Sequence, residues 1–101
     1  MPDFTKYAYE EIFRYFQFKR PDGQDGLGAA EILSSQAVTC AEKETLVDTT
    51  ATMISDTGIY DNTQVIYKIK GGTVGKSYYV YVRAITSTGQ KLEGDVIVTV
   101  K

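Results

Sequence analysis

Hydrophobic and polar residues alternate with a period of two through much of the chain after residue 30. The pattern is clearest in "YYVYVRAITSTGQ", residues 78–90, which ends in a glycine turn. Such alternation places successive side chains on opposite faces of a β-strand. One predicted face narrows from aromatic to small side chains, as a core lining does, and comprises Tyr78, Val80, Val82, Ala84 and Thr86. The opposite face comprises Tyr79, Tyr81, Arg83 and Ile85.

Further short runs rich in β-branched residues precede and follow this segment. They read "EILSSQAVTC", "LVDTTATMIS", "TQVIYKIK" and "KLEGDVIVTVK", and polar or glycine-containing turns separate them. Five or more short strands with no helical pattern between them predict antiparallel sheets. Such a set usually buries its apolar faces in a β-sandwich. We therefore expect residues 31–101 to form a mainly β, antiparallel sandwich.

The first 20 residues carry a different pattern. In "DFTKYAYEEIFRYFQFK" a helical wheel gathers one apolar face, comprising Phe4, Ala8, Ile12, Tyr15 and Phe16. This predicts an N-terminal aromatic helical segment over residues 1–20. "RYFQFK" also alternates with a period of two, so a strand is the alternative there. Residues 21–30 contain Pro21 and several glycines, which predicts a Gly-rich linker.

Length and charge restrict the classes of protein to which the chain can belong. Its 101 residues predict a single domain spanning 1–101. The formal net charge of −2 gives no broad positive field, so we expect neither nucleic acid nor membrane as a partner. The acidic start "MPDFTKYAYEE" does not match a signal peptide. We therefore expect a soluble product made in the bacterial cytoplasm.

Candidate catalytic and ligand-binding residues are few. Histidine is absent, which removes histidine-dependent nucleophilic catalysis. The single cysteine, Cys40, stands among small apolar neighbours that predict a buried thiol. The acidic turns around Asp22 and Asp56 lack the ligand spacing of a calcium-binding loop. We expect no enzyme activity, cofactor, metal site or small-molecule substrate.

The segment "GGTVGKS", residues 71–77, comes nearest to a phosphate-binding motif. A P-loop needs four residues between its first glycine and the GK[ST] triplet, and here the gap from Gly71 to Gly75 is one residue short. A P-loop also opens a helix, whereas the residues that follow predict a strand. We expect Gly71, Gly72 and Gly75 to form a tight corner before Tyr78.

The pattern Tyr-x-Val-x-Val-x-Ala-x-Thr-x-x-Gly, which begins at Tyr78, resembles the sixth strand of fibronectin type III and related immunoglobulin-like sandwiches. The resemblance implies an immunoglobulin-like sandwich in which Tyr78 forms a tyrosine corner. Its hydroxyl would bond to the backbone of the preceding turn. The chain departs from the fibronectin pattern in having "GGTVGK" at this corner and no tryptophan.

A longer stretch, "YKIKGGTVGKSYYVYVRAITSTGQKLEGDVIVTVK", resembles small tailed-phage virion proteins of the fibre-tail adaptor type. The shared features are hydrophobic-x-Gly-Gly-Thr-x-Gly-x-x-Tyr at 69–78, Thr-Ser-x-Gly at 86–89, Glu93 and the valine-rich run at 96–100. The resemblance implies a phage or prophage structural or adaptor protein located in the virion. Its implied partners are other virion proteins or copies of itself.

The outward side chains of the 78–90 segment are the candidate interaction face, comprising Tyr79, Tyr81, Arg83 and Ile85. Tyrosine and arginine are over-represented at interface hot spots. Alternatively these side chains form ordinary cross-strand pairs, or the N-terminal segment covers them. For the chain as a whole, the alternative is a bacterial immunoglobulin-like or fibronectin-like binding module outside any virion.

Overall fold

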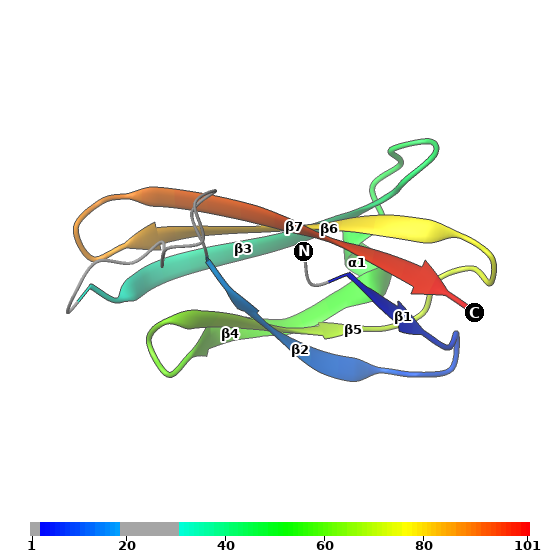
Figure 1. The fold of residues 1–101 in the computed structure, drawn as a ribbon, viewed down its shortest axis with the longest axis horizontal. Coiled ribbons are helices and arrows are strands. Elements are labelled where there is room, and N and C mark those ends of the chain that lie inside the picture. The colour runs from blue at the N-terminus through cyan, green and yellow to red at the C-terminus, as the bar shows by residue number, and fades with distance from the viewer. Residues whose placement is uncertain (1–2, 19–30) are drawn as a thin grey trace.

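The computed structural model describes residues 3–18 and 31–101, which form two packed β-sheets (Figure 1). Within these ranges one sheet has the strand order β1-β7-β6-β3 and the other the order β2-β5-β4. The elements are β1 (Phe4–Lys6), β2 (Ile12–Gln17), β3 (Leu33–Glu42), α1 (Thr50–Met53), β4 (Ile54–Tyr60), β5 (Gln64–Ile69), β6 (Ser77–Thr86) and β7 (Lys91–Val100). The predicted mainly β sandwich is confirmed.

Antiparallel pairing dominates both sheets. β6 lies between β3 and β7, so that Tyr78 is opposite Glu42 on one side and Val98 on the other. β5 likewise lies between β2 and β4. Among the described strands, β1 departs from this pattern because it runs parallel to the C-terminal end of β7.

The N-terminal segment departs from the helix predicted for residues 1–20. Its described part forms β1 at the edge of one sheet and β2 at the edge of the other (Figure 1). In β2 and just beyond it, Phe16 and Phe18 are buried while Gln17 is exposed, as the strand alternative for "RYFQFK" requires. Pairing with β5 aligns six residues of β2, satisfies the backbone groups that point toward β5 and buries aromatic rings, which outweighs the local helical periodicity. The linker predicted for residues 21–30 lies outside the described residues.

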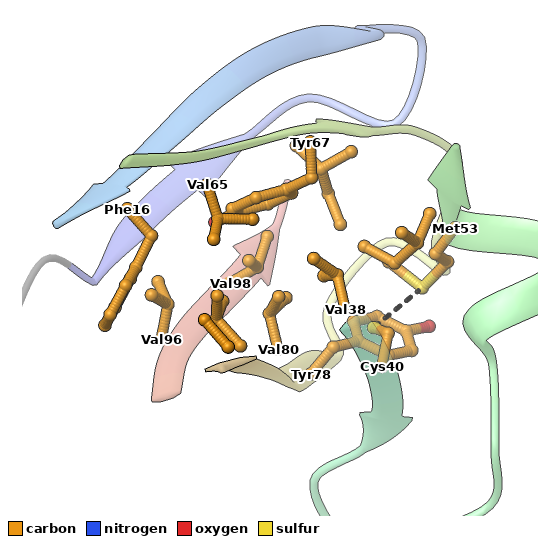
Figure 2. Packing of buried hydrophobic residues seen from close by; sticks show 14 of the residues in the cluster. Phe16, Val38, Cys40, Met53, Val65, Tyr67, Tyr78, Val80, Val96 and Val98 are labelled. Carbon is orange, nitrogen blue, oxygen red and sulfur yellow. Dashed lines mark hydrogen bonds between the residues drawn. The ribbon is translucent and has the colours of Figure 1, made fainter. Parts of the chain in front are cut away.

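Side chains from both sheets meet in one core (Figure 2). Val80 of β6, Val98 of β7 and Val65 of β5 are fully buried. Cys40 is buried, as predicted, and its Sγ lies 3.9 Å from Sδ of Met53. Because burial raises the pKa of the Cys40 thiol, this side chain packs as a neutral hydrophobe.

Gly94 makes room for Phe16 where β7 faces β2. A Cβ atom added at Gly94 would lie 2.2 Å from Cζ of Phe16. The aromatic ring therefore packs directly on the β7 backbone, which requires glycine at this position in the strand.

Candidate interaction surfaces

The corner between β5 and β6 contains the predicted glycines. Gly71, Gly72 and Gly75 have φ values of 63°, 93° and 87°, a region that glycine adopts without steric cost. A Cβ at Gly72 would also lie 2.7 Å from Cγ2 of Val100. The hydroxyl of Tyr78 accepts a hydrogen bond from the backbone N–H of Thr73 at 2.8 Å. This bond ties the start of β6 to the turn before it.

Lys6 reaches the same corner from β1. Its side chain is fully buried, and its Nζ donates hydrogen bonds to the carbonyl oxygens of Tyr7 at 2.8 Å and Gly71 at 2.7 Å. Burial lowers the pKa of Lys6, and the carboxylates of Glu10 and Glu11 offset part of that change. The hydrogen bond from Lys6 to the Gly71 carbonyl connects β1 to the β5–β6 corner.

The four candidate contact residues of β6 lie on the outer face of the four-stranded sheet. Tyr79 and Tyr81 are half-buried, and their ring centroids are 5.8 Å apart. Arg83 and Ile85 are exposed. Small side chains lie beside them on β3, namely Ala41, Thr39, Ala37 and Ser35 in register. The described part of the N-terminal segment does not cover this face, because β1 and β2 lie at sheet edges.

The Arg83 end of this face is hollowed. A concavity of about 430 Å³ opens there over β3, β6 and β7. Nε of Arg83 lies 2.6 Å from Oε1 of Glu93 in an ion pair at its rim. We call this concavity the β6 hollow; its lining includes Ser35, Ala37, Arg83, Ile85, Lys91 and Glu93.

A second apolar surface, which the sequence did not lead us to expect, covers the outer face of the three-stranded sheet. Phe13 and Tyr15 of β2 are 51% and 52% exposed. The ring of Tyr15 packs edge-to-face on Tyr60 of β4, with centroids 4.8 Å apart. Nζ of Lys68 lies 5.6 Å from the centroid of the Phe13 ring. The signal that would have found this surface is the alternation in "IFRYFQF", which places Phe13 and Tyr15 opposite the buried Phe16.

A polar cluster closes the turn between β6 and β7. The buried carboxylate of Glu31 accepts hydrogen bonds from the hydroxyls of Thr86 and Thr88, and from the amide of Gln90 at 3.3 Å. A buried carboxylate is tolerated where such donors surround it. Glu31 thereby fixes the turn that follows β6.

Two further features can be stated of the described residues. Within 3–18 and 31–101, no three His, Cys, Asp or Glu side chains gather as a metal site would require. In that same part of the chain, no helix has the length and apolar character needed to cross a membrane. Exposed tyrosine, phenylalanine and arginine side chains are typical of protein interfaces.

Comparison with known proteins adds a family match. A family model described as "Podophage GP4 fiber-tail adaptor protein gp77" matches residues 20–99. The match covers most of the chain. It contains the β6 hollow and the outward side chains Tyr79, Tyr81, Arg83 and Ile85, which we call the β6 face, whereas β1 and β2 precede it. No curated protein and no solved structure gives a significant match.

Proposed function

The chain belongs to the podophage GP4 fiber-tail adaptor (gp77) family, a family of phage structural proteins, and on that premise we propose that it acts through protein–protein assembly without catalysis. In this proposal its partners are other virion proteins or further copies of itself. Neither nucleic acid, nor a membrane, nor a small-molecule substrate takes part.

The observation that carries this proposal is the family match over residues 20–99. A bacterial immunoglobulin-like binding module outside a virion would also be a sandwich, but that alternative does not account for the match. The outer face of β6 supports an assembly role, because tyrosine and arginine side chains supply much of the binding energy at interfaces. Tyr79, Tyr81, Arg83 and Ile85 form the proposed contact surface.

The buried reactive groups agree with a structural role. The Cys40 thiol contacts Met53 inside the core, and the Lys6 ammonium is held by backbone carbonyls. Catalytic cysteines and lysines need access to substrate, and catalytic cysteines also have a pKa lowered toward the thiolate. Burial instead raises the pKa of Cys40, away from the reactive thiolate.

Deletion of the gene from its phage or prophage tests the proposal. We expect particles whose tails lack fibres in negative-stain electron microscopy and whose fibre protein is depleted on immunoblots. A complementing wild-type gene should restore both. Normal fibres on deletion particles would contradict the adaptor role, and absence of the chain from purified particles would contradict its virion location.

Point variants in the complementing gene test the proposed surface. Tyr81→Ala should restore fibres poorly, because it removes an aromatic side chain from the centre of the β6 face. Tyr9→Ala is the matched control, since Tyr9 is 96% exposed in the turn between β1 and β2. Equal restoration by both variants, with equal melting temperatures, would remove the β6 face from the proposal.

A further inference from the structure

Residues 43–48, which we call the aliphatic tip, form the loop that protrudes after β3 at one end of the molecule (Figure 1). Leu46 and Val47 at this tip are 63% and 59% exposed. Two adjacent aliphatic side chains at the end of a projecting loop present apolar surface in a shape that can enter a concavity.

Leu46 is held in an uncommon backbone conformation. Its φ is +59°, a left-handed value that residues other than Gly, Asn and Asp rarely adopt. The turn is fixed by two backbone hydrogen bonds, from Leu46 N–H to Glu42 O at 2.8 Å and from Glu42 N–H to Val47 O at 3.0 Å. Strained residues of this kind cluster at functional sites. The exposed Leu46 side chain thus points to a contact with another molecule.

The β6 hollow lies toward the other end of β3. Ser35 and Ala37 line the hollow, whereas the tip follows Glu42. Roughly 20 Å of strand therefore separates the two features, and the tip cannot reach the hollow of its own chain.

The hollow matches the tip in size and polarity. Its volume of about 430 Å³ has room for two aliphatic side chains, because a cavity of roughly 150 Å³ already accommodates benzene. Ala37 and Ile85 supply apolar lining. Its charged lining residues are Arg83 and Lys91 with Glu93, an excess of positive charge.

The charges of the tip have the opposite sign. Glu44 and Asp48 flank the aliphatic pair, with Lys43 as the accompanying cation. We propose that the aliphatic tip of one copy inserts into the β6 hollow of a second copy. Because the two surfaces differ and lie apart along β3, the contact is heterologous and repeats head to tail. A series of such contacts forms a ring or an open chain, depending on the rotation between copies.

This inference deepens the self-assembly part of the proposed function and rests on it. Its test uses the purified full chain, so its failure leaves the gene-deletion test of the adaptor role unaffected.

The first measurement is molar mass against protein concentration, by light scattering and sedimentation. The wild type should increase in mass with concentration, less so in high salt because the contact is partly electrostatic. A tip variant, Leu46→Asn with Val47→Thr, and a hollow variant, Ala37→Glu, should stay monomeric.

Two controls accompany these variants. Asn tolerates a positive φ, so the tip variant should melt no lower than the wild type. Val74→Thr is the matched control, because Val74 is 64% exposed on a different loop, and it should associate like the wild type.

Mixing the variants separates this contact from other modes of association. The hollow variant keeps an intact tip and the tip variant keeps an intact hollow. Their equimolar mixture should therefore form one contact per pair and stop at dimers. A Val47→Cys copy mixed with an Ala37→Cys copy should likewise give a disulfide-linked heterodimer faster than either forms a homodimer.

A wild type that stays monomeric at every concentration, together with cysteine variants that give no heterodimer, would overturn the proposal. So would a mixture of tip and hollow variants that fails to dimerise. If the chain is monomeric and the hollow variant still fails to restore fibres in the complementation assay, the hollow takes a different virion protein and the second copy is excluded as its occupant.

Discussion

At the residue scale, Tyr78 combines a buried ring with a hydroxyl that accepts a hydrogen bond from the β5–β6 corner. The ring is 3% exposed, and the hydroxyl accepts the Thr73 N–H at 2.8 Å. In Tyr78→Phe the ring keeps its packing while the backbone N–H loses its acceptor. We expect the free energy of unfolding to fall by about 1–2 kcal/mol, measured by urea denaturation followed by circular dichroism.

Tyr79→Phe is the matched control for this change. Tyr79 is adjacent in sequence but lies half-buried on the outer face of the sheet, so we expect little effect on stability. If Tyr78→Phe is as stable as the wild type, the corner does not depend on the hydroxyl bond.

Tyr67 gives the fold a dependence on alkaline pH. It is 1% exposed, and burial raises the pKa of its phenol to about 12, whereas an unfolded tyrosine titrates near about 10. The folded state therefore holds the proton more tightly. The resulting stabilisation is fully present below about pH 10 and is lost, by about 2–3 kcal/mol, as the pH rises through the folded value.

Urea midpoints measured across this pH range test the assignment. The wild type should lose more stability than Tyr67→Phe, which has no phenol to ionise at this position. Equal alkaline losses in the two proteins would show that Tyr67 ionisation does not control this part of the profile.

At the scale of elements, β6 could be predicted because the alternation within its own sequence shows which of its side chains are buried. Every second residue from Tyr78 to Thr86 is buried, so the period of two is complete within one strand. The N-terminal segment was ambiguous, because the alternation in "RYFQFK" competes with a helical periodicity in the same residues. β1 has three residues, too few to show a period, and pairing with β5 and β7 far along the chain decides the conformation of both strands.

The β6 hollow could not be derived from the sequence for a related reason. The sequence indicated Arg83 and Ile85, but the space beside them comes from Ala37 opposite Arg83 and Ser35 opposite Ile85 on β3. That register includes an irregularity between Leu33 and Ser35. Because a slip of one residue moves every side chain to the other face, the concavity exists only once the two strands are aligned.

The assignment of β2 as a strand makes a prediction for two phenylalanines of one segment. Phe16 is 8% exposed in the core, whereas Phe13 is 51% exposed on the outer face. We expect Phe16→Ala to lower the free energy of unfolding by about 3–5 kcal/mol and Phe13→Ala to change it little. Chemical denaturation of both variants measures the difference, with Phe16→Leu as a milder substitute if Phe16→Ala does not fold. Similar losses at both positions would contradict the β2 register.

At the scale of the whole molecule, the N-terminal segment supplies one edge strand to each sheet. β1 pairs with β7, and β2 pairs with β5 (Figure 1). The turn after β1 is also tied to the C-terminal residue, because Lys101 N–H donates to Lys6 O at 2.9 Å and Ala8 N–H donates to Lys101 O at 3.2 Å. The segment thus covers backbone groups at both sheet edges, although the family match begins only at residue 20.

Removal of residues 1–18 should therefore abolish cooperative thermal unfolding of the remaining chain. The truncation exposes the edges of β5 and β7 and takes Phe16 and Phe18 out of the core. Exposed strand edges pair with other chains, so light scattering should show aggregation. A synthetic peptide of residues 1–18 should restore the cooperative transition, because it returns both strands. A truncated chain that melts cooperatively at the wild-type temperature would show that residues 19–101 fold without these strands, and that the segment serves contacts with a neighbour instead.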